Sequence, residues 1–188
     1  MGVDNTPASA ANAVPKPYDA NVPGMSLSGS VPIRFELSGV ASGKRRNDVK
    51  VGMAQPHRLK LWDIASDEAP FHGGDESAPK PLSIFFAGIV TCFMTQMRTF
   101  ARPCGVEVRG LKVDASIDWT LLRDGMKPYT AKTGPIIFNI ELDTDAPLEA
   151  QQQLVRTAAK GCFAEASLRE APLHRLLYQG EWLECAVS

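Results

Sequence analysis

The apolar segment 81–102 constrains the fold more than any other part of the chain. Pro81 suits a first helical position, where its missing N–H has no helical partner, and Pro103 and Gly105 end the helix. The apolar side chains of this segment fall on every side of a helix: Leu82, Ile84, Phe85, Phe86, Ile89, Val90, Phe93, Met94, Met97 and Phe100. A helix that is apolar all round must be enclosed by other parts of the structure.

We expect this helix to lie in a protein core rather than in a membrane. Its most apolar part, 82–94, is interrupted by Ser83, Gly88 and Thr91. That part is also shorter than the roughly 20 residues that a membrane span needs. The N-terminus lacks a basic region followed by an apolar one, so a cytoplasmic protein is expected. The formal net charge of -1 argues against a nucleic-acid or anionic-membrane partner.

The segment before the helix predicts an arm and an antiparallel meander. Residues 1–30 have almost no large apolar side chains, which predicts a flexible arm before a single domain over 31–188. Three runs, 33–38, 49–54 and 57–63, alternate apolar and polar residues as half-buried strands do. The segment 64–80, with its Pro and Gly-Gly interruptions, is expected to be a loop.

The segment after the helix adds two strands, a helix and a last strand. A long strand is predicted over 106–119, with a bulge near Arg109-Gly110, and the turn Asp124-Gly125 leads to a strand over 138–142. Asp145 is the predicted N-cap of a helix with Pro147 in its first turn, and the chain ends in a strand over 183–187. The order β-β-β-α-β-β-α-β predicts an α+β fold.

One sheet can cover only one side of the apolar helix. A second copy of the chain is the simplest cover for the other side, so we expect an obligate homodimer.

Two of the four cysteines are expected to lie in the two helices. Cys92 is central in the apolar helix, and Cys162 continues the stripe Leu154, Ala158, Cys162, Ala166 of the second helix. Each follows a glycine that lets another helix approach, Gly88 one turn earlier and Gly161 directly before. A buried thiol is more often a packing residue than a reactive one, but two thiols that meet in a core form a redox pair. Cys104, after Pro103, and Cys185, on a strand, are expected to be structural.

The spacing of the cysteines disfavours other uses. There is no CxxC motif, and the three histidines do not cluster with the cysteines in the sequence. Neither a disulfide framework nor a metal site is expected.

Two motifs resemble those of the OsmC/Ohr family. The first is Phe71-His-Gly-Gly-Asp followed by the run from Pro81 to Cys92-Phe93, and the second is Lys160-Gly-Cys162-Phe-Ala-Glu-Ala-Ser-Leu168. The resemblance covers about residues 31–187. It implies an intertwined homodimer in which antiparallel sheets from both subunits wrap two central helices.

The resemblance also implies a thiol-dependent peroxidase that needs no cofactor. Cys92 would attack a small apolar organic hydroperoxide, and Cys162 would resolve the resulting sulfenic acid to a disulfide that a dithiol reduces. Of the three candidate arginines that could activate Cys92, Arg46 matches best by element order, ahead of Arg45 and Arg58. The family's carboxylate that holds this arginine is replaced by Leu82 and Ser83, with Asp75 or Glu76 as substitutes. The family's proline after the second cysteine is Phe163.

Two other functions fit the same residues. One is a hydrolase with a cysteine nucleophile and His57, His72 or His174 as the base. The other is a non-catalytic protein, either one that binds an apolar ligand or a scaffold dimer. The apolar side chains Phe85, Phe86, Phe93 and Met94 fit a pocket for an apolar hydroperoxide, and they fit an ordinary core equally well.

Overall fold

The computed structural model describes residues 29–56 and 59–187. The chain forms two compact units, 1–81 and 82–188, and each is described by itself. Residues 1–28 of the predicted arm lie outside the described residues, as do His57 and Arg58. The single domain predicted over 31–188 stays a prediction.

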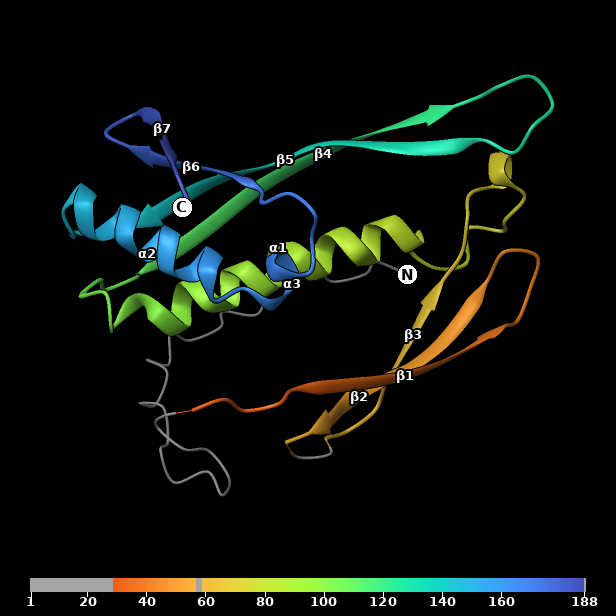
Figure 1. Ribbon diagram of the computed structural model, residues 1–188, viewed down its shortest axis with the longest axis horizontal. Coiled ribbons are helices and arrows are strands. Elements are labelled where there is room, and N and C mark those ends of the chain that lie inside the picture. The colour runs from red at the N-terminus through yellow and green to blue at the C-terminus, as the bar shows by residue number, and fades with distance from the viewer. Residues whose placement is uncertain (1–28, 57–58, 188) are drawn as a thin grey trace, which may run out of the picture. The chain divides into compact units, whose positions relative to one another are not determined.

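The N-terminal unit is an antiparallel meander. Its strands β1 (Arg34–Ala41), β2 (Asn47–Gln55) and β3 (Trp62–Ser66) pair in the order β1-β2-β3 (Figure 1). A short 3-10 helix, η1 (Pro70–His72), follows the meander. The meander itself agrees with the alternation of apolar residues in the sequence.

The third strand begins later than its sequence pattern predicts. Pairing with β2 starts at Trp62, opposite Val51, and continues to Ser66, inside the segment predicted to be a loop. The alternating Leu59 and Leu61, which suggested an earlier start, are both exposed. The backbone N–H of Leu59 donates to the carbonyl of Met53 at 3.0 Å, and the backbone carbonyl of Lys60 and the side chain of Leu61 lie close to Gly52, so this stretch runs beside β2 before the regular pairing begins.

The C-terminal unit is a four-stranded sheet with helices on one side (Figure 1). The helices are α1 (Pro81–Ala101), α2 (Leu148–Lys160) and the short α3 (Phe163–Ala166). The strands are β4 (Gly110–Leu122), β5 (Thr130–Asp143), β6 (Leu173–Tyr178) and β7 (Glu181–Cys185), in the order β4-β5-β6-β7. All neighbours are antiparallel except β5 and β6, which are parallel. The α+β class is therefore confirmed.

The core of this unit lies between its helices and one face of the sheet. Phe93 of α1, Phe138 of β5 and Leu154 of α2 are fully buried together. Alternate residues of β5 face the helices because successive side chains of a strand point to opposite faces. Burial of each large apolar side chain contributes about 1.5–3 kcal/mol, so the packing of α1 against β5 and α2 stabilises the surroundings of both helical cysteine segments.

The α1 helix is confirmed as a long apolar helix, but this unit covers only one of its faces. Ile89, Phe93, Met97 and Ala101, each four residues apart, are buried, whereas Leu82 and Phe85 are 50% and 48% exposed. By length and composition alone α1 would also pass for a membrane span, and it is the only such helix among the described residues. The enclosure that its sequence predicts requires a cover from outside the unit.

Two local predictions in the C-terminal unit were wrong. The bulge of β4 lies between Ile117 and Trp119 rather than near Arg109. Asp145 does not cap α2, whose N-cap residue is Pro147. The Asp145 carboxylate instead accepts hydrogen bonds from Arg109, with Nη1–Oδ2 at 2.5 Å and Nη2–Oδ1 at 3.1 Å. The charge of Arg109 thus holds Asp145 away from the helix end.

The strand β6 is absent from the sequence prediction. Its six residues, Leu-His-Arg-Leu-Leu-Tyr, mix charged and apolar side chains, and only His174 and Leu176 are fully buried. A histidine on the inward face broke the apolar alternation that marks a strand. This strand carries a residue of the candidate site.

Candidate functional site

Cys92 lies half-buried in the middle of α1, beside the buried Phe93. One turn earlier, a Cβ added to Gly88 would have no neighbour within 4 Å. The helix surface at Gly88 is therefore open within the C-terminal unit, in agreement with the prediction that another element can approach there. Cys92 is a free thiol.

Cys162 is fully buried, but it does not lie within a helix as predicted. The α2 helix ends at Lys160, and Cys162 is the N-cap residue of α3. A Cβ on Gly161 would stand 2.4 Å from Cε2 of Phe100, so the missing side chain of Gly161 lets α1 pack directly against the turn. This break between α2 and α3 lets Cys162 point into the core instead of continuing the stripe of α2.

The structure brings the two predicted cysteines together. The Cys92 thiol is a hydrogen-bonding and electrostatic neighbour of the Cys162 thiol, and both are free. Burial is the main cause that raises the pKa of Cys162 to about 12, and the Cys92 thiol adds to the rise. The backbone N–H of Glu165 faces the sulfur and opposes the rise. Cys162 is therefore held as a neutral thiol at neutral pH.

Beside this pair lies a second polar pair that the sequence did not reveal. His174 Nε2 and Glu165 Oε1 are 3.3 Å apart, and their side chains are 0% and 5% exposed. The imidazole packs against Phe93 and Phe138, with ring centroids 4.9 Å and 5.4 Å away. The one sign of this pair in the sequence is Glu165, which follows Cys162 by three residues within the second motif.

The histidines do not form a catalytic base for Cys92 in the described part of the chain. His174 directs Nε2 to Glu165, and its Nδ1 has no hydrogen-bond partner. His72 lies in the N-terminal unit, where its Nδ1 is 3.3 Å from Glu68 Oε2. His57 lies outside the described residues. Within the described part of the C-terminal unit, His174 therefore does not make the nucleophile–base contact that a cysteine hydrolase needs.

The other two cysteines lie where the sequence predicts. The backbone N–H of Cys104 donates to the carbonyl of Phe100 in the turn after α1. Cys185 is buried on β7 opposite His174, and burial raises the pKa of its thiol. Among the described residues, no group of three or more His, Cys, Asp or Glu side chains is arranged to hold a metal ion.

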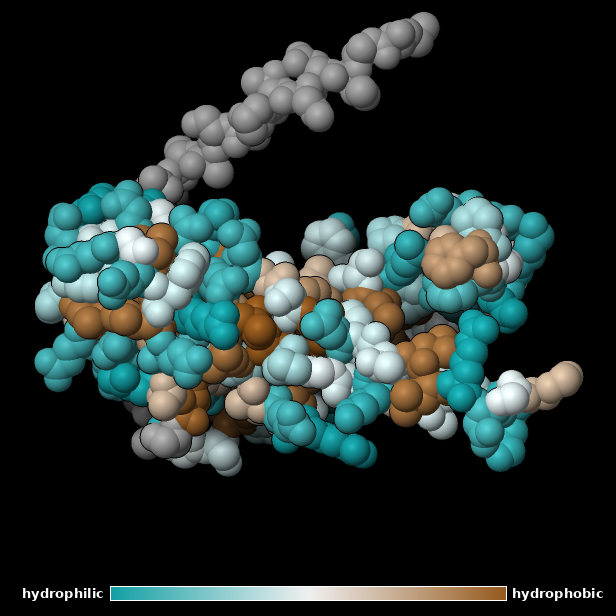
Figure 2. Space-filling view, turned by 90° about the horizontal axis from the view of Figure 1, so that it is seen from above, coloured by the Kyte–Doolittle hydropathy of each residue, from teal (hydrophilic) through white to brown (hydrophobic). Residues whose placement is uncertain are grey.

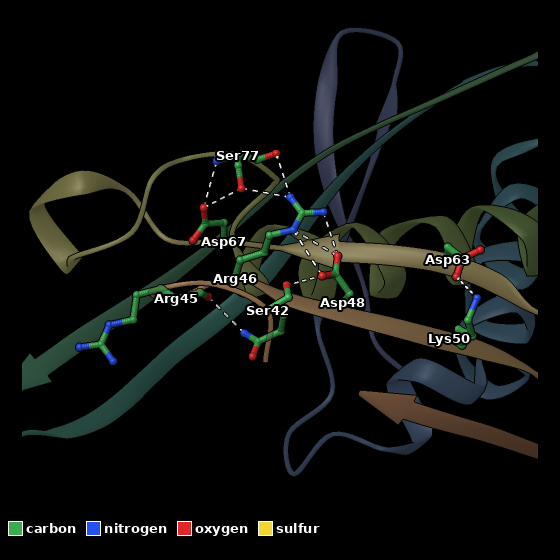
Figure 3. Close-up of polar contacts among 9 residues, drawn as sticks. Ser42, Arg45, Arg46, Asp48, Lys50, Asp63, Asp67 and Ser77 are labelled. Atoms are coloured by element: carbon green, nitrogen blue, oxygen red, sulfur yellow. Dashed lines mark hydrogen bonds and ion pairs between the residues drawn. The ribbon is translucent and has the colours of Figure 1, made fainter. Parts of the chain in front are cut away.

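Arg46 is held by a polar network inside the N-terminal unit (Figure 3). Its Nη2 donates to Asp48 Oδ1 at 2.8 Å and its Nη1 donates to Ser77 Oγ at 3.0 Å. Ser77 Oγ in turn donates to Asp67 Oδ2 at 2.8 Å. The guanidinium is thus fixed on two sides, by a carboxylate and by a hydroxyl that a second carboxylate orients.

The two carboxylates of this network are held in their ionised form. A hydrogen bond from Ser42 and then those from Arg46 lower the pKa of Asp48. The backbone N–H of Ser77 is the largest cause that lowers the pKa of the buried Asp67. Both carboxylates can therefore pair with a cation over the whole neutral range.

The carboxylate that pairs with Arg46 is Asp48, whereas Asp75, one of the two expected substitutes for the family carboxylate, pairs with Lys44 at 2.7 Å. Of the other two arginines, Arg45 Nε donates to the carbonyl of His72 at 3.4 Å, and Arg58 lies outside the described residues.

The comparisons identify the class of protein. Residues 73–176, more than half of the chain, match the model of a family described as OsmC-like protein. The chain belongs to the OsmC family, as its two cysteine motifs predict. No curated protein sequence matches it.

Several solved structures resemble the chain. An OsmC-like hydroperoxide resistance protein from a Jannaschia species is 34% identical, with 81% of this chain and 97% of that chain covered and a TM-score of 0.48. An OsmC-like protein from Mycoplasma pneumoniae is 12% identical, covers 77% and 98%, and has a TM-score of 0.56. An organic hydroperoxide resistance protein from Legionella pneumophila is 17% identical, covers 76% and 94%, and has a TM-score of 0.50. The last two support the fold alone.

Proposed function

We propose that this protein reduces organic hydroperoxides with the thiol pair Cys92 and Cys162. The observation that carries the proposal is that these two free thiols, 70 positions apart in the sequence, are neighbours in an apolar core. An apolar site favours alkyl peroxides over hydrogen peroxide because it excludes polar ligands. Membership of the OsmC family supports the same reaction.

The reaction proceeds in three balanced steps. The Cys92 thiol loses its proton, the thiolate attacks the hydroxyl-bearing oxygen of the hydroperoxide, the O–O bond breaks, and the alkyl-bearing oxygen takes up that proton and leaves as an alcohol. Cys92 is then a sulfenic acid. The Cys162 sulfur bonds to the Cys92 sulfur, the S–O bond breaks, and the hydroxyl leaves as water. An external dithiol reduces the disulfide and returns both cysteines to thiols.

We propose Arg46 as the cation that favours the Cys92 thiolate. A thiolate in an apolar site needs a positive charge nearby, because burial alone favours the neutral thiol. In this chain Asp48 takes the role of the family carboxylate that is missing at Leu82 and Ser83. The support is the fixed guanidinium, bonded to Asp48 and Ser77.

Peroxide turnover with a dithiol tests the proposal. We expect the protein to consume cumene hydroperoxide with dithiothreitol, faster than it consumes hydrogen peroxide. Cys92→Ser should abolish turnover. In Cys162→Ser, Cys92 should accumulate as the sulfenic acid, and excess peroxide should oxidise it further to the sulfinic acid. Arg46→Gln lowers the rate at which Cys92 is oxidised, and Cys104→Ser is the matched control that leaves it unchanged. No turnover with any organic hydroperoxide would support the non-catalytic, ligand-binding alternative.

A further inference from the structure

The buried pair of Glu165 and His174 has features of a functional pair rather than of a purely structural one. Its two side chains are buried, and His174 Nδ1 has no hydrogen-bond partner among the described residues. A buried polar atom without a partner costs about 1–3 kcal/mol, so a purely structural role would favour apolar residues here. The pair lies beside Cys162, whose sulfur faces the backbone N–H of Glu165.

The reaction proposed above requires a proton acceptor at this place. The Cys162 thiol must lose its proton as its sulfur bonds to Cys92, yet burial keeps it protonated. The carboxylate of Glu165 acts electrostatically on Cys162, and its hydrogen-bond partner is His174. Water has little access to a sulfur that is fully buried.

We propose that Glu165, oriented by His174, accepts the proton of Cys162 when Cys162 attacks the oxidised Cys92. This inference rests on the proposed thiol pair. In the resolving step, the S–H bond of Cys162 breaks, its proton passes to the Glu165 carboxylate, and the new bond joins the two sulfurs. The proton then completes the departing hydroxyl of Cys92 as water, so the carboxylate is regenerated. His174 is a positioning residue, since it acts on Cys162 through Glu165.

Titratable groups act on this site from α1, α2, α3, β6 and β7. Cys162 faces Cys92 of α1 and Glu165 of α3, and His174 of β6 faces Glu165. Cys185 of β7 lies opposite His174, and Arg156 of α2 acts electrostatically on Cys185. A Cys185 variant therefore serves as the control when the pH dependence of a Glu165 variant is measured.

A disulfide-exchange reaction tests the proposal without a peroxide. In a Cys104→Ser background, 2,2′-dithiodipyridine reacts with Cys92 and releases one thiopyridone. Attack of Cys162 on the mixed disulfide then releases a second one, and Cys162→Ser must abolish this second release. We expect Glu165→Gln to slow the second release about 100-fold at pH 7, in the range of general-base catalysis, and to leave the first unchanged. The remaining rate should rise with hydroxide concentration.

Further variants keep the test decisive. Glu165→Asp retains the carboxylate and should keep part of the rate, and it serves as the probe should Glu165→Gln fail to fold. His174→Gln, which can still donate to Glu165, should slow the second release less than His174→Leu, and Cys185→Ser should not slow it. An unchanged or faster second release in Glu165→Gln overturns the proposal, because the carboxylate would then only repel the Cys162 thiolate. A second release that persists in Cys162→Ser overturns the thiol pair itself, whereas failure of peroxide turnover alone overturns only the proposed function.

Discussion

Gly161 lies directly beneath the ring of Phe100. A Cβ at this glycine would come within 2.4 Å of Cε2 and 2.8 Å of Cζ. The backbone of Gly161 is right-handed, with φ at -88°, so its conformation is open to any residue. The glycine is therefore required for the close approach of α1 to the turn that carries Cys162.

Gly161→Ala should destabilise the fold by about 1–3 kcal/mol, the usual cost of an overpacked contact. Phe100→Leu in the same chain should recover much of this loss because it removes the ring that clashes. Urea unfolding of both single variants and of the double variant measures the coupling. Gly134→Ala is the control, since its added Cβ would stand 3.5 Å from the nearest atom, an ordinary contact. Strict additivity of Gly161→Ala and Phe100→Leu would contradict the clash.

Two Glu–His pairs at the same separation should differ sharply in their effect on stability. Glu165–His174 and Glu68–His72 are both 3.3 Å apart, but the first is buried and the second has side chains 29% and 54% exposed. His174→Leu should cost about 3–5 kcal/mol, because it leaves a buried carboxylate without its partner. His72→Leu should change stability by no more than about 1 kcal/mol. Equal losses of stability in urea unfolding would show that burial does not decide how much each pair affects stability.

A double variant tests whether the Glu165–His174 pair as a whole stabilises the fold. Glu165→Met together with His174→Leu removes both polar groups and the unpaired Nδ1 of the imidazole. We expect stability near or above that of the parent, since apolar residues often replace a buried ion pair without loss. A loss as large as that of His174→Leu alone would show that the pair itself stabilises the fold.

The sequence predicted those parts of the fold that a regular apolar pattern marks. The meander and the hairpin of β4 and β5 alternate apolar and polar residues, and α1 is a long apolar segment that begins at Pro81 and ends before Pro103. The strand β6 was missed because His174 occupies an inward position, where its partner Glu165 lies nine positions earlier in the chain. A single sequence does not reveal that a charged side chain is paired in a core.

The two predicted site cysteines illustrate the same limit. Their proximity was predicted from motifs, and it is present in the structure. The position of Cys162 at a helix break was not predicted, because its stripe with Leu154 and Ala158 continues smoothly in the sequence. The pairing of Asp48 with Arg46 was not predicted, because two opposite charges only two positions apart leave no distinctive pattern in the sequence.

The raised pKa of Cys162 predicts a loss of stability in alkali. In the folded chain this thiol stays protonated up to about pH 12, whereas its ordinary pKa is 9.0. Above pH 9 the unfolded state binds fewer protons than the folded state, so stability falls by up to about 1.4 kcal/mol per pH unit until pH 12. Below pH 9 both states hold the proton, and this residue adds no pH dependence.

Comparison of two alanine variants isolates this effect. Urea unfolding at pH 8 and pH 10 should show a smaller loss for Cys162→Ala than for the parent, by about 1 kcal/mol. Cys104→Ala, in the turn after α1, should lose as much as the parent. The same alkaline loss in all three proteins would mean that the Cys162 thiol is not held protonated by the fold.

The exposed face of α1 has the surface that a second copy of the chain would need. Thr91, Thr95 and Thr99 donate their hydroxyls to carbonyls one turn earlier in the helix, at 2.7, 2.8 and 2.9 Å. These hydroxyls already have hydrogen-bond partners, so they could be buried without leaving a donor unpaired. Leu82 and Phe85 add exposed apolar area to the same helix. Figure 2 shows hydrophobic residues in brown that reach the surface of the molecule among hydrophilic ones. We predict that a second copy of the chain covers this face, because its burial would favour a homodimer.

A bulky charge on this face should separate the subunits. Thr91 is exposed within one chain, so Thr91→Arg costs little in a monomer, but it would force an unpaired charge into an interface between two α1 helices. Sedimentation equilibrium should show a dimer for the parent and a monomer, or a dimer weakened by more than about 100-fold, for Thr91→Arg. Gln153→Arg introduces the same side chain at an exposed position of α2 and should leave the dimer intact. If both variants remain as dimeric as the parent, the copies associate through another surface and α1 is covered differently. A parent protein that is monomeric would overturn the dimer altogether, and binding of the parent to neutral lipid vesicles would then point to a membrane as the cover of α1.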